Sequence, residues 1–346
     1  MKLLVSALEP SSNLHLKEML RHTHDIELLG IYDNALGDPL YDISEVAIMG
    51  VVDAIKKVRW FMRIAQEMVT LAKEADKILL MDGSGFNLPL AKKLKRAYPD
   101  KEIIYYILPQ LWASRPKRAK RLERYCDRLL GILPFEVDYY PSHKAEYVGH
   151  PLLDEIAVTR QAQSGAIAFM PGSRKSEINR LLPLFKALVS QLPDKKALLI
   201  IPASFSAEKI TALYGDISQF EVHHETHTAL AQAEFAFICS GTATLEAALI
   251  GTPFILTYIA KPIDYFIGTK LLGITQIGLA NIILSHTQQP PLHQELLQED
   301  VTPKKLLEAY QQTDPQRFRD KALALRNYLQ HGSSQRVAQI IMGEES

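Results

Sequence analysis

Short apolar runs alternate with amphipathic stretches along most of this chain, and this alternation constrains the fold more than any other feature. The apolar runs read as strands at residues 2–7, 26–32, 77–81, 102–108, 128–133, 166–170, 197–201, 234–239 and 253–258. Strands that alternate with helices build parallel sheets covered by helices. The sequence therefore predicts an α/β fold.

The strand–helix pattern restarts after Pro151, so we expect two successive domains. A polar segment at residues 159–165 follows, and 346 residues exceed the roughly 250–300 that one core supports. We predict two Rossmann-like domains, residues 1–157 and 158–315, facing a central cleft. Residues 316–346 read as a helical tail that packs back on the chain or across a dimer. In such folds ligands bind at the carboxyl ends of the strands.

Composition and charge exclude several classes of protein. Cys126 and Cys239 show no metal-ligand or CxxC spacing, which argues against a disulfide framework and a zinc site. No apolar stretch approaches the roughly 18–20 residues of a membrane span, and the N-terminal run is too short for a signal peptide. The formal net charge is +0, which argues against general nucleic-acid binding. We expect a protein of a reducing compartment that does not cross a membrane.

The turn after the strand at 166–170 has the residues of an anion site. Gly172 lets the backbone approach a ligand, Ser173 can cap the following helix, and Arg174 can bind a phosphate with two hydrogen bonds. Any strand-to-helix turn favours Gly and Ser, but that does not explain Arg174. This turn is the strongest chemical signal in the sequence.

A second turn of this kind follows the strand at 234–239. Ser240, Gly241 and Thr242 precede a helix whose free N–H groups and dipole would favour a phosphate. Glu246 falls one turn into that helix, where its carboxylate can accept both hydroxyls of a ribose or simply favour the helix start. Together the two turns suggest a site for a nucleoside diphosphate.

In the first half, Asp82 directly follows the strand at 77–81. A carboxylate at the carboxyl end of a parallel strand can face a bound substrate and serve as a general base. We therefore treat Asp82 as the candidate catalytic base.

A helix expected near residues 49–64 carries an apolar stripe at 51, 55, 58 and 62 and basic residues on the opposite side. Such a stripe is most often core. Basic residues around a Trp also suit a helix at an anionic membrane surface, and residues 91–128 add twelve Lys and Arg against four Asp and Glu. We favour membrane contact. The residues expected to make it are Val52, Ile55, Val58, Trp60, Phe61 and Met62.

Motifs spread over essentially the whole chain resemble those of the lipid-A-disaccharide synthases, a family of two-domain GT-B glycosyltransferases. The matching stretches are residues 45–50, 82 with 86–87, 109–110 with 112–113, 133–136, 149–152, 171–174 with 177, 240–246, 261–262 and 281. Single members are common, but their order and spacing together are specific.

The resemblance implies an inverting transfer of 2,3-diacylglucosamine from UDP-2,3-diacylglucosamine to the 6-hydroxyl of 2,3-diacylglucosamine 1-phosphate, forming the lipid A disaccharide. Asp82 would be the general base. Arg174, with Gly172 and Ser173, and the Ser240–Gly241–Thr242 turn would hold the diphosphate. Glu246 would take the ribose, and Asn281 would line the UDP site. The resemblance implies no metal and no cofactor.

The first strand-to-helix loop differs from the family pattern, Gly-Glu-Ala-Ser-Gly-Asp. Here it reads Leu-Glu-Pro-Ser-Ser-Asn over residues 8–13, so Glu9 and Ser11 persist while Asn13 replaces the Asp. Asn13 can hydrogen-bond but cannot take a proton. We assign Glu9, Ser11 and Asn13 to acceptor binding.

The acylated substrates imply an enzyme bound peripherally to the cytoplasmic face of the inner membrane, with a homodimer as one arrangement of its tail. Two alternatives stay open. One is another UDP-sugar-dependent GT-B enzyme, such as an N-acetylglucosaminyltransferase or an epimerase. The other is a non-catalytic lipid- or nucleotide-binding protein.

Overall fold

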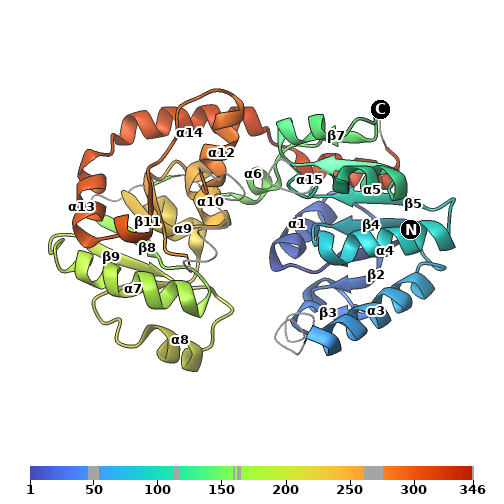
Figure 1. The fold of residues 1–346 in the computed structure, drawn as a ribbon, viewed down its shortest axis with the longest axis horizontal. Helices are drawn as coiled ribbons and strands as arrows, with labels where there is room; N and C mark the ends of the chain where they lie inside the picture. The colour runs from blue at the N-terminus through green and yellow to red at the C-terminus, as the bar shows by residue number, and fades with distance from the viewer. Residues whose placement is uncertain (46–53, 112–116, 159, 162–164, 261–275, 345–346) are drawn as a thin grey trace. The chain divides into compact units, whose positions relative to one another are not determined.

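A computed structural model describes residues 1–45, 54–111, 117–158, 160–161, 165–260 and 276–344 of the chain. The chain divides into two compact units (Figure 1). Unit 1 comprises Met1–Glu155 with Leu329–Ser346, and unit 2 comprises Ile156–Tyr328. Each unit is built on one parallel sheet with helices on its faces, so the prediction of two Rossmann-like α/β domains is confirmed.

The sheet of unit 1 has seven parallel strands in the order β3-β2-β1-β4-β5-β6-β7. The strands are β1 Lys2–Ala7, β2 Glu27–Tyr32, β3 Tyr41–Asp42, β4 Lys77–Met81, β5 Glu102–Tyr106, β6 Arg128–Gly131 and β7 Ala145–Tyr147. Ala7 of β1 pairs with Met81 of β4. The loops that follow these two strands therefore leave the sheet side by side.

Alternate residues of β1 point into two cores, one on each face of the sheet. Leu3 and Val5 pack with α1 and α15, whereas Leu4 packs with α3, α4 and α5. The longer helices of unit 1 are α1 Pro10–Leu20, α3 Ala54–Leu71, α4 Ser84–Ala97, α5 Lys117–Tyr125 and α15 Ser333–Met342. The shorter ones are η1 Asn34–Leu36, η2 Pro134–Tyr139 and α6 Pro151–Glu155. Burial on both faces explains why the strands read as unbroken apolar runs.

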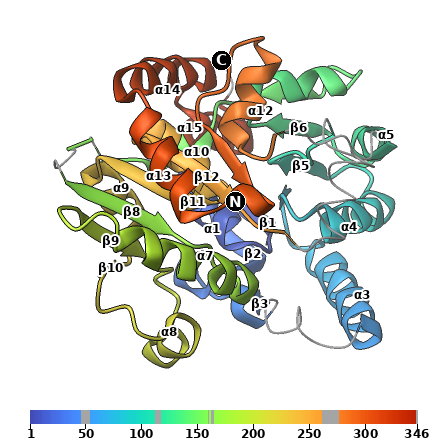
Figure 2. The ribbon, with the colours of Figure 1, turned by 60° about the vertical axis from the view of Figure 1, so that its left-hand side comes forward.

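The sheet of unit 2 has six parallel strands in the order β10-β9-β8-β11-β12-β13. They are β8 Ala166–Met170, β9 Lys196–Ile200, β10 Glu221–His223, β11 Phe235–Cys239, β12 Phe254–Tyr258 and β13 Glu295–Leu297. The helices are α7 Lys175–Val189, α8 Ala207–Tyr214, α9 Thr226–Gln232, α10 Thr242–Ile250, α12 Leu279–His286, η4 Gln298–Asp300, α13 Pro303–Gln312 and α14 Pro315–Leu329. Helix α7 lies over one face of the sheet, across β8 and β9 (Figure 2).

The C-terminal segment contributes one helix to each unit. In α14, Phe318 packs against Phe254 of β12, within unit 2. In α15, Val337 and Ile341 are fully buried in the core of unit 1, so the last helix packs back onto that unit. Among the described residues, no helix combines the length and the apolar character needed to span a bilayer.

The short edge strands β3, β7, β10 and β13 were not predicted, because they span only two or three residues and carry charged or polar side chains. The predicted strand at 102–108 also ends early. Ile107 has a φ of 64°, in the left-handed region, and its N–H donates to Leu130 of β6. A β-branched residue with this backbone conformation cannot continue a strand.

Candidate functional site

Asp82 lies at the carboxyl end of β4 in a loop that a buried side chain holds in place. Asp82 has a φ of 45°, and the amide of Asn87 in α4 donates to the carbonyls of Met81 at 2.9 Å and Asp82 at 3.0 Å. The Asn87 oxygen accepts from Ser6 of β1 at 2.6 Å. The Tyr105 hydroxyl also donates to the Asp82 carbonyl, at 2.5 Å. These contacts fix the backbone from which the Asp82 carboxylate projects.

Burial raises the pKa of Asp82, because a half-buried carboxylate loses hydration. A hydrogen bond from the Gly83 N–H and the charge of His15 act in the opposite direction on this pKa. His15 lies in α1, and its Nδ1 is bonded to the Glu155 carboxylate, with both side chains mostly buried. A carboxylate with a raised pKa is a better proton acceptor, as a general base requires.

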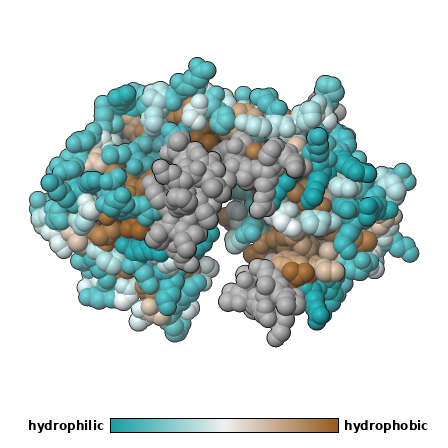
Figure 3. Space-filling view, in the orientation of Figure 1, coloured by the Kyte–Doolittle hydropathy of each residue, from teal (hydrophilic) through white to brown (hydrophobic). Residues whose placement is uncertain are grey.

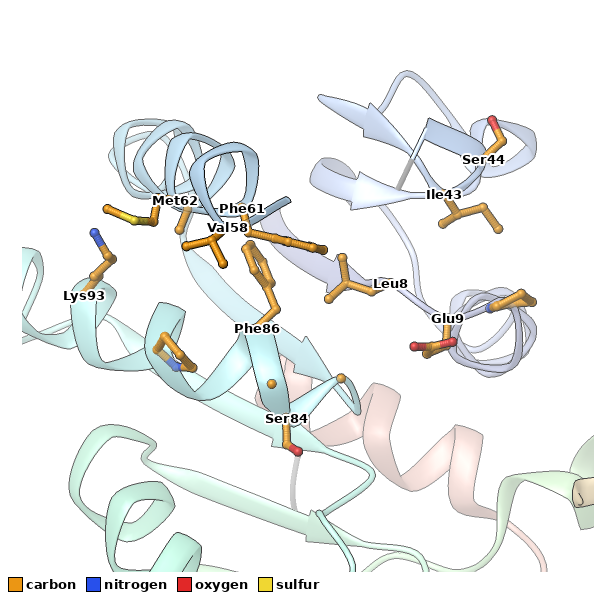
Figure 4. A pocket seen from close by; sticks show the side chains of 15 residues that line it. Leu8, Glu9, Ile43, Ser44, Val58, Phe61, Met62, Ser84, Phe86 and Lys93 are labelled. Carbon is orange, nitrogen blue, oxygen red and sulfur yellow. The ribbon is translucent and has the colours of Figure 1, made fainter. Parts of the chain in front are cut away.

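An apolar pocket of about 890 Å³ opens beside the Asp82 loop in unit 1. In Figure 4 Leu8, Val58, Phe61 and Phe86 point toward one another, while Glu9 and Lys93 lie at opposite ends. Gly83 and Ser84, which directly follow Asp82, also line this pocket. Its hydrophobic side chains form a brown patch on the surface of unit 1 (Figure 3).

The residues predicted to contact a membrane lie partly on this pocket and partly against the core, where Trp60 and Phe61 pack. Val58 and Met62 of α3 are 58% and 61% exposed and line the pocket. The helix instead buries Ile64 and Met68 completely. Trp60 and Phe61 are half-buried and stack edge to face on each other, with ring centroids 5.1 Å apart. Val52 and the side chain of Ile55 lie outside the described residues.

The loop between β1 and α1 places its predicted acceptor residues in different surroundings. Glu9 is exposed and lines the pocket, and Ser11 is half-buried. Asn13 is buried, and its amide donates to the carbonyls of Ala7 and Glu9, both at 2.9 Å, while its oxygen accepts from the Asp33 N–H at 2.8 Å. Both N–H donors of Asn13 are therefore used within the protein.

In unit 2, the turn between β8 and α7 is organised by Glu177. The Glu177 carboxylate accepts from the backbone N–H groups of Ser173 and Arg174, both at 3.2 Å, and from the Arg174 guanidinium at 3.0 Å. Gly172 has a φ of 97°, and a Cβ there would collide with this carboxylate. The Arg174 side chain remains 78% exposed. The turn therefore presents a cation on a backbone that allows only glycine at 172.

The second turn lies beside the first, because β8 and β11 are neighbouring parallel strands with Met170 opposite Ile238. Gly241 precedes α10 with a φ of 142°, and the Thr244 hydroxyl donates to the Gly241 carbonyl at 2.8 Å. The predicted residues Ser240, Gly241 and Thr242 thus lie at the same sheet edge as Ser173 and Arg174. This edge gathers backbone N–H groups, hydroxyls and a guanidinium, the donors that bind phosphates.

Glu246 and Asn281, the other predicted nucleotide residues, already have protein partners. Glu246 Oε2 lies 3.4 Å from His227 Nε2 of α9. Asn281 is buried, and its amide donates to the His293 carbonyl at 3.0 Å and to Glu295 at 2.9 Å. Its oxygen accepts from the Leu292 N–H at 2.8 Å. Asn281 thereby ties α12 to the approach of β13.

The chain was compared with known proteins by sequence. The family model described as lipid-A-disaccharide synthetase matches residues 3–342. The chain belongs to the lipid-A-disaccharide synthase family. It is 48% identical to the lipid-A-disaccharide synthase of Helicobacter pylori strain G27, covering 97% of this chain and 96% of that protein. It is 42% identical to the Campylobacter jejuni enzyme, covering 98% of both. The predicted family and its glycosyltransferase activity are confirmed.

Solved structures support the fold assignment of this family member. A UDP-GlcNAc 2-epimerase from Neisseria meningitidis bound to UDP-GlcNAc has a TM-score of 0.66 at 11% identity, with complete coverage of both chains. The glycosyltransferase of kitacinnamycin has a TM-score of 0.58 at 16% identity, covering 100% of this chain and 98% of that one. At these identities the likeness concerns the fold alone, which is of the GT-B type.

Several residues that shape the site in this family member were not assigned a role from the sequence. Glu177 carried a usable signal, because a Glu on the first turn of a helix often binds the preceding backbone N–H groups. Tyr105 and His227 carried none. Tyr105 reaches Asp82 from the neighbouring strand, and His227 reaches Glu246 from another helix.

Proposed function

We propose that the chain transfers 2,3-diacylglucosamine from UDP-2,3-diacylglucosamine to the 6-hydroxyl of 2,3-diacylglucosamine 1-phosphate, with inversion at the anomeric carbon. Membership of the lipid-A-disaccharide synthase family supports the reaction as a whole. The observation that carries the chemistry is Asp82, a carboxylate with a pKa raised by burial, at a strand end beside an apolar pocket.

In the proposed reaction Asp82 accepts the proton of the 6-hydroxyl while that oxygen attacks the anomeric carbon. The bond from the anomeric carbon to the diphosphate breaks as the new glycosidic bond forms, and UDP leaves. A single displacement of this kind inverts the configuration. The electron pair of the broken bond passes to the diphosphate, so the enzyme must stabilise negative charge there.

The two strand-end turns of unit 2 supply that stabilisation in our proposal. Arg174 binds the diphosphate with its exposed guanidinium, and the backbone N–H groups near Ser173 and Gly241 add donors. Hydroxyls of Ser240 and Thr242 complete the site, and Glu246 accepts the ribose hydroxyls. Asn281 acts by holding α12 in place, since both N–H donors of its amide are used within the protein.

The pocket of unit 1 takes an acyl chain in this proposal. Its walls are mainly apolar side chains, including Leu8, Phe61 and Phe86, and it begins at the residues that follow Asp82. Burial of an acyl chain contributes about 0.8 kcal/mol per CH₂ group. An acceptor bound this way would place its sugar beside Asp82, within reach of Glu9 at the rim.

We also propose that unit 1 binds the cytoplasmic face of the inner membrane. Val58 and Met62 offer exposed apolar contacts on α3. Exposed cations from the neighbouring helices α4 and α5 suit anionic headgroups; they are Lys92, Lys93, Arg96, Lys120, Arg121 and Arg124. A homodimer stays a prediction.

The proposal is tested by UDP release from UDP-2,3-diacylglucosamine in detergent, with and without 2,3-diacylglucosamine 1-phosphate. We expect UDP only when the acceptor is present, together with one β-linked disaccharide product. UDP release that does not need the acceptor would contradict a transferase and favour a hydrolase or an epimerase-like enzyme. Transfer to unacylated N-acetylglucosamine acceptors at the same rate would contradict the acyl-chain assignment.

A further inference from the structure

A histidine in unit 2 holds one oxygen of the carboxylate assigned to the nucleotide ribose. His227 Nε2 lies 3.4 Å from Glu246 Oε2, and the two side chains are 29% and 16% exposed. Neither the motifs nor the family resemblance single out His227. The pair joins α9 to α10, two helices in contact with each other.

A buried hydrogen bond links the two helices that carry this pair. The Thr252 hydroxyl, just past the end of α10, donates to the Leu230 carbonyl of α9 at 2.7 Å, and both groups are buried. At the other end of α10, Thr244 is tied to Gly241 at 2.8 Å. His227 and Glu246 therefore project from two helices that are in contact and joined by a buried hydrogen bond.

A glutamate has three side-chain torsions, so a carboxylate that must accept two adjacent hydroxyls loses conformational freedom on binding. A partner that fixes one oxygen beforehand removes part of that cost. The contact with His227 engages only Oε2, so in this account Oε1 is the oxygen that meets the ligand first.

We infer that His227 is a positioning residue that orients Glu246 to accept the ribose hydroxyls, and so sets the preference of the enzyme for ribonucleotide over 2′-deoxyribonucleotide donors. The inference rests on the proposed function, because it takes Glu246 as the ribose acceptor. His227 itself touches neither the sugar that is transferred nor the diphosphate in this account.

The test measures the affinity of purified His227→Ala and His227→Gln for UDP and for 2′-deoxy-UDP by calorimetry. We expect His227→Ala to bind UDP about tenfold more weakly than the wild type, with 2′-deoxy-UDP much less affected. His227→Gln keeps an N–H donor and should recover most of the UDP affinity. In turnover assays the KM for the donor should rise, while kcat stays within about twofold.

His223→Ala is the matched control, because His223 Nε2 also pairs with a glutamate of unit 2, Glu221, at 2.9 Å. We expect its affinities to match the wild type. Thermal unfolding shows whether each variant is folded. If His227→Ala does not fold, the affinities of His227→Gln for the two nucleotides are compared with those of the wild type instead. Equal weakening of both nucleotides in His227→Ala, or no weakening of either, would overturn the inference.

Glu246→Gln separates failure of this inference from failure of the proposed donor site. If Glu246→Gln abolishes the preference for UDP over 2′-deoxy-UDP and His227→Ala does not, the ribose assignment stands and the role of His227 is wrong. If Glu246→Gln leaves that preference unchanged, the ribose assignment itself is wrong.

Discussion

The two units carry opposite kinds of side chain at the same strand-end position. In unit 1 the loop after β4 carries a half-buried carboxylate, Asp82, beside an apolar pocket. In unit 2 the turn after β8 carries Arg174, a cation that is 78% exposed, beside a second turn of hydroxyl residues. In our proposal the first loop removes a proton from a lipid-bearing sugar, and the second holds a diphosphate.

The residues that stabilise the two loops also differ in charge. Asn87 lies on the first turn of α4 and donates to the carbonyls of its loop, which adds no charge beside Asp82. Glu177 lies on the first turn of α7 and accepts from the N–H groups of its turn and from Arg174. A neutral amide leaves the carboxylate free to act as a base, whereas an anion orients a cation.

The largest expected effect is on turnover in Asp82→Asn. Loss of a general base should lower kcat by about a hundredfold or more, because the amide cannot take the proton of the attacking hydroxyl. Acceptor-dependent UDP release measures it. Asp100→Asn, an exposed aspartate of the same unit, is the control and should keep wild-type turnover. Near-normal turnover in Asp82→Asn would contradict the assignment of Asp82 as the general base.

Arg174→Ala should lower kcat/KM for the donor by about tenfold to a hundredfold, since negative charge develops on the diphosphate as the bond breaks. Arg174→Lys should recover only part of the loss, because an ammonium cannot bind two oxygens in the planar geometry of a guanidinium. Steady-state kinetics with varied donor checks both. Arg317→Ala, an exposed arginine on α14, should leave the kinetics unchanged. A fully active Arg174→Ala would contradict the assignment of diphosphate binding to this turn of unit 2.

A smaller effect is expected when Val58 and Met62 are both changed to Ser. Loss of two exposed apolar side chains from α3 should weaken binding to anionic vesicles severalfold and lower activity on vesicle-borne acceptor in proportion. Co-sedimentation with vesicles measures the binding. Leu323→Ser is matched to these two in exposure, at 59%, but lies on α14. Equal loss of binding in Leu323→Ser would contradict a lipid-facing surface confined to unit 1.

The smallest expected effect concerns stability. Burial raises the pKa of Asp82 in the folded protein, so ionisation of this group disfavours folding at pH values above that raised pKa. Asp82→Asn should therefore be more stable than the wild type at pH 7, by about 1 kcal/mol or less. The gain should vanish as the pH falls below the ordinary pKa of Asp, where both side chains are neutral. Urea unfolding across this pH range measures it, and a less stable Asn variant at pH 7 would contradict the burial argument.

The long central strands could be predicted from the sequence, and the short edge strands could not. Apolar runs such as those of β1, β4 and β8 are buried on both faces, so their pattern alone predicts their bounds. Strands such as Glu221–His223 form because the neighbouring strand provides backbone hydrogen-bonding partners. Their own residues do not show the pattern of a strand. Likewise, the pairing of α15 with unit 1 depends on contacts with residues at the other end of the chain.

The loops of the candidate site could be predicted from the sequence, but the hydrogen bonds that hold them in place could be predicted only in part. Strand ends followed by Asp82, by Arg174 and by Gly241 are visible in the sequence. The sequence does not show that the amides of Asn13 and Asn281 are hydrogen-bonded within the protein, because their partners are brought close only by folding. The apolar stripe at 51, 55, 58 and 62 was interpreted as a membrane face. Val58 and Met62 are exposed, and membrane contact stays a prediction.

Calorimetric titration of UDP into Asp82→Asn and Arg174→Ala, side by side with the wild type, tests the division of labour between the units most directly. We predict wild-type affinity for Asp82→Asn and about tenfold or greater weakening for Arg174→Ala. Equal weakening of UDP binding in both variants would contradict the assignment of the base to unit 1 and the nucleotide to unit 2.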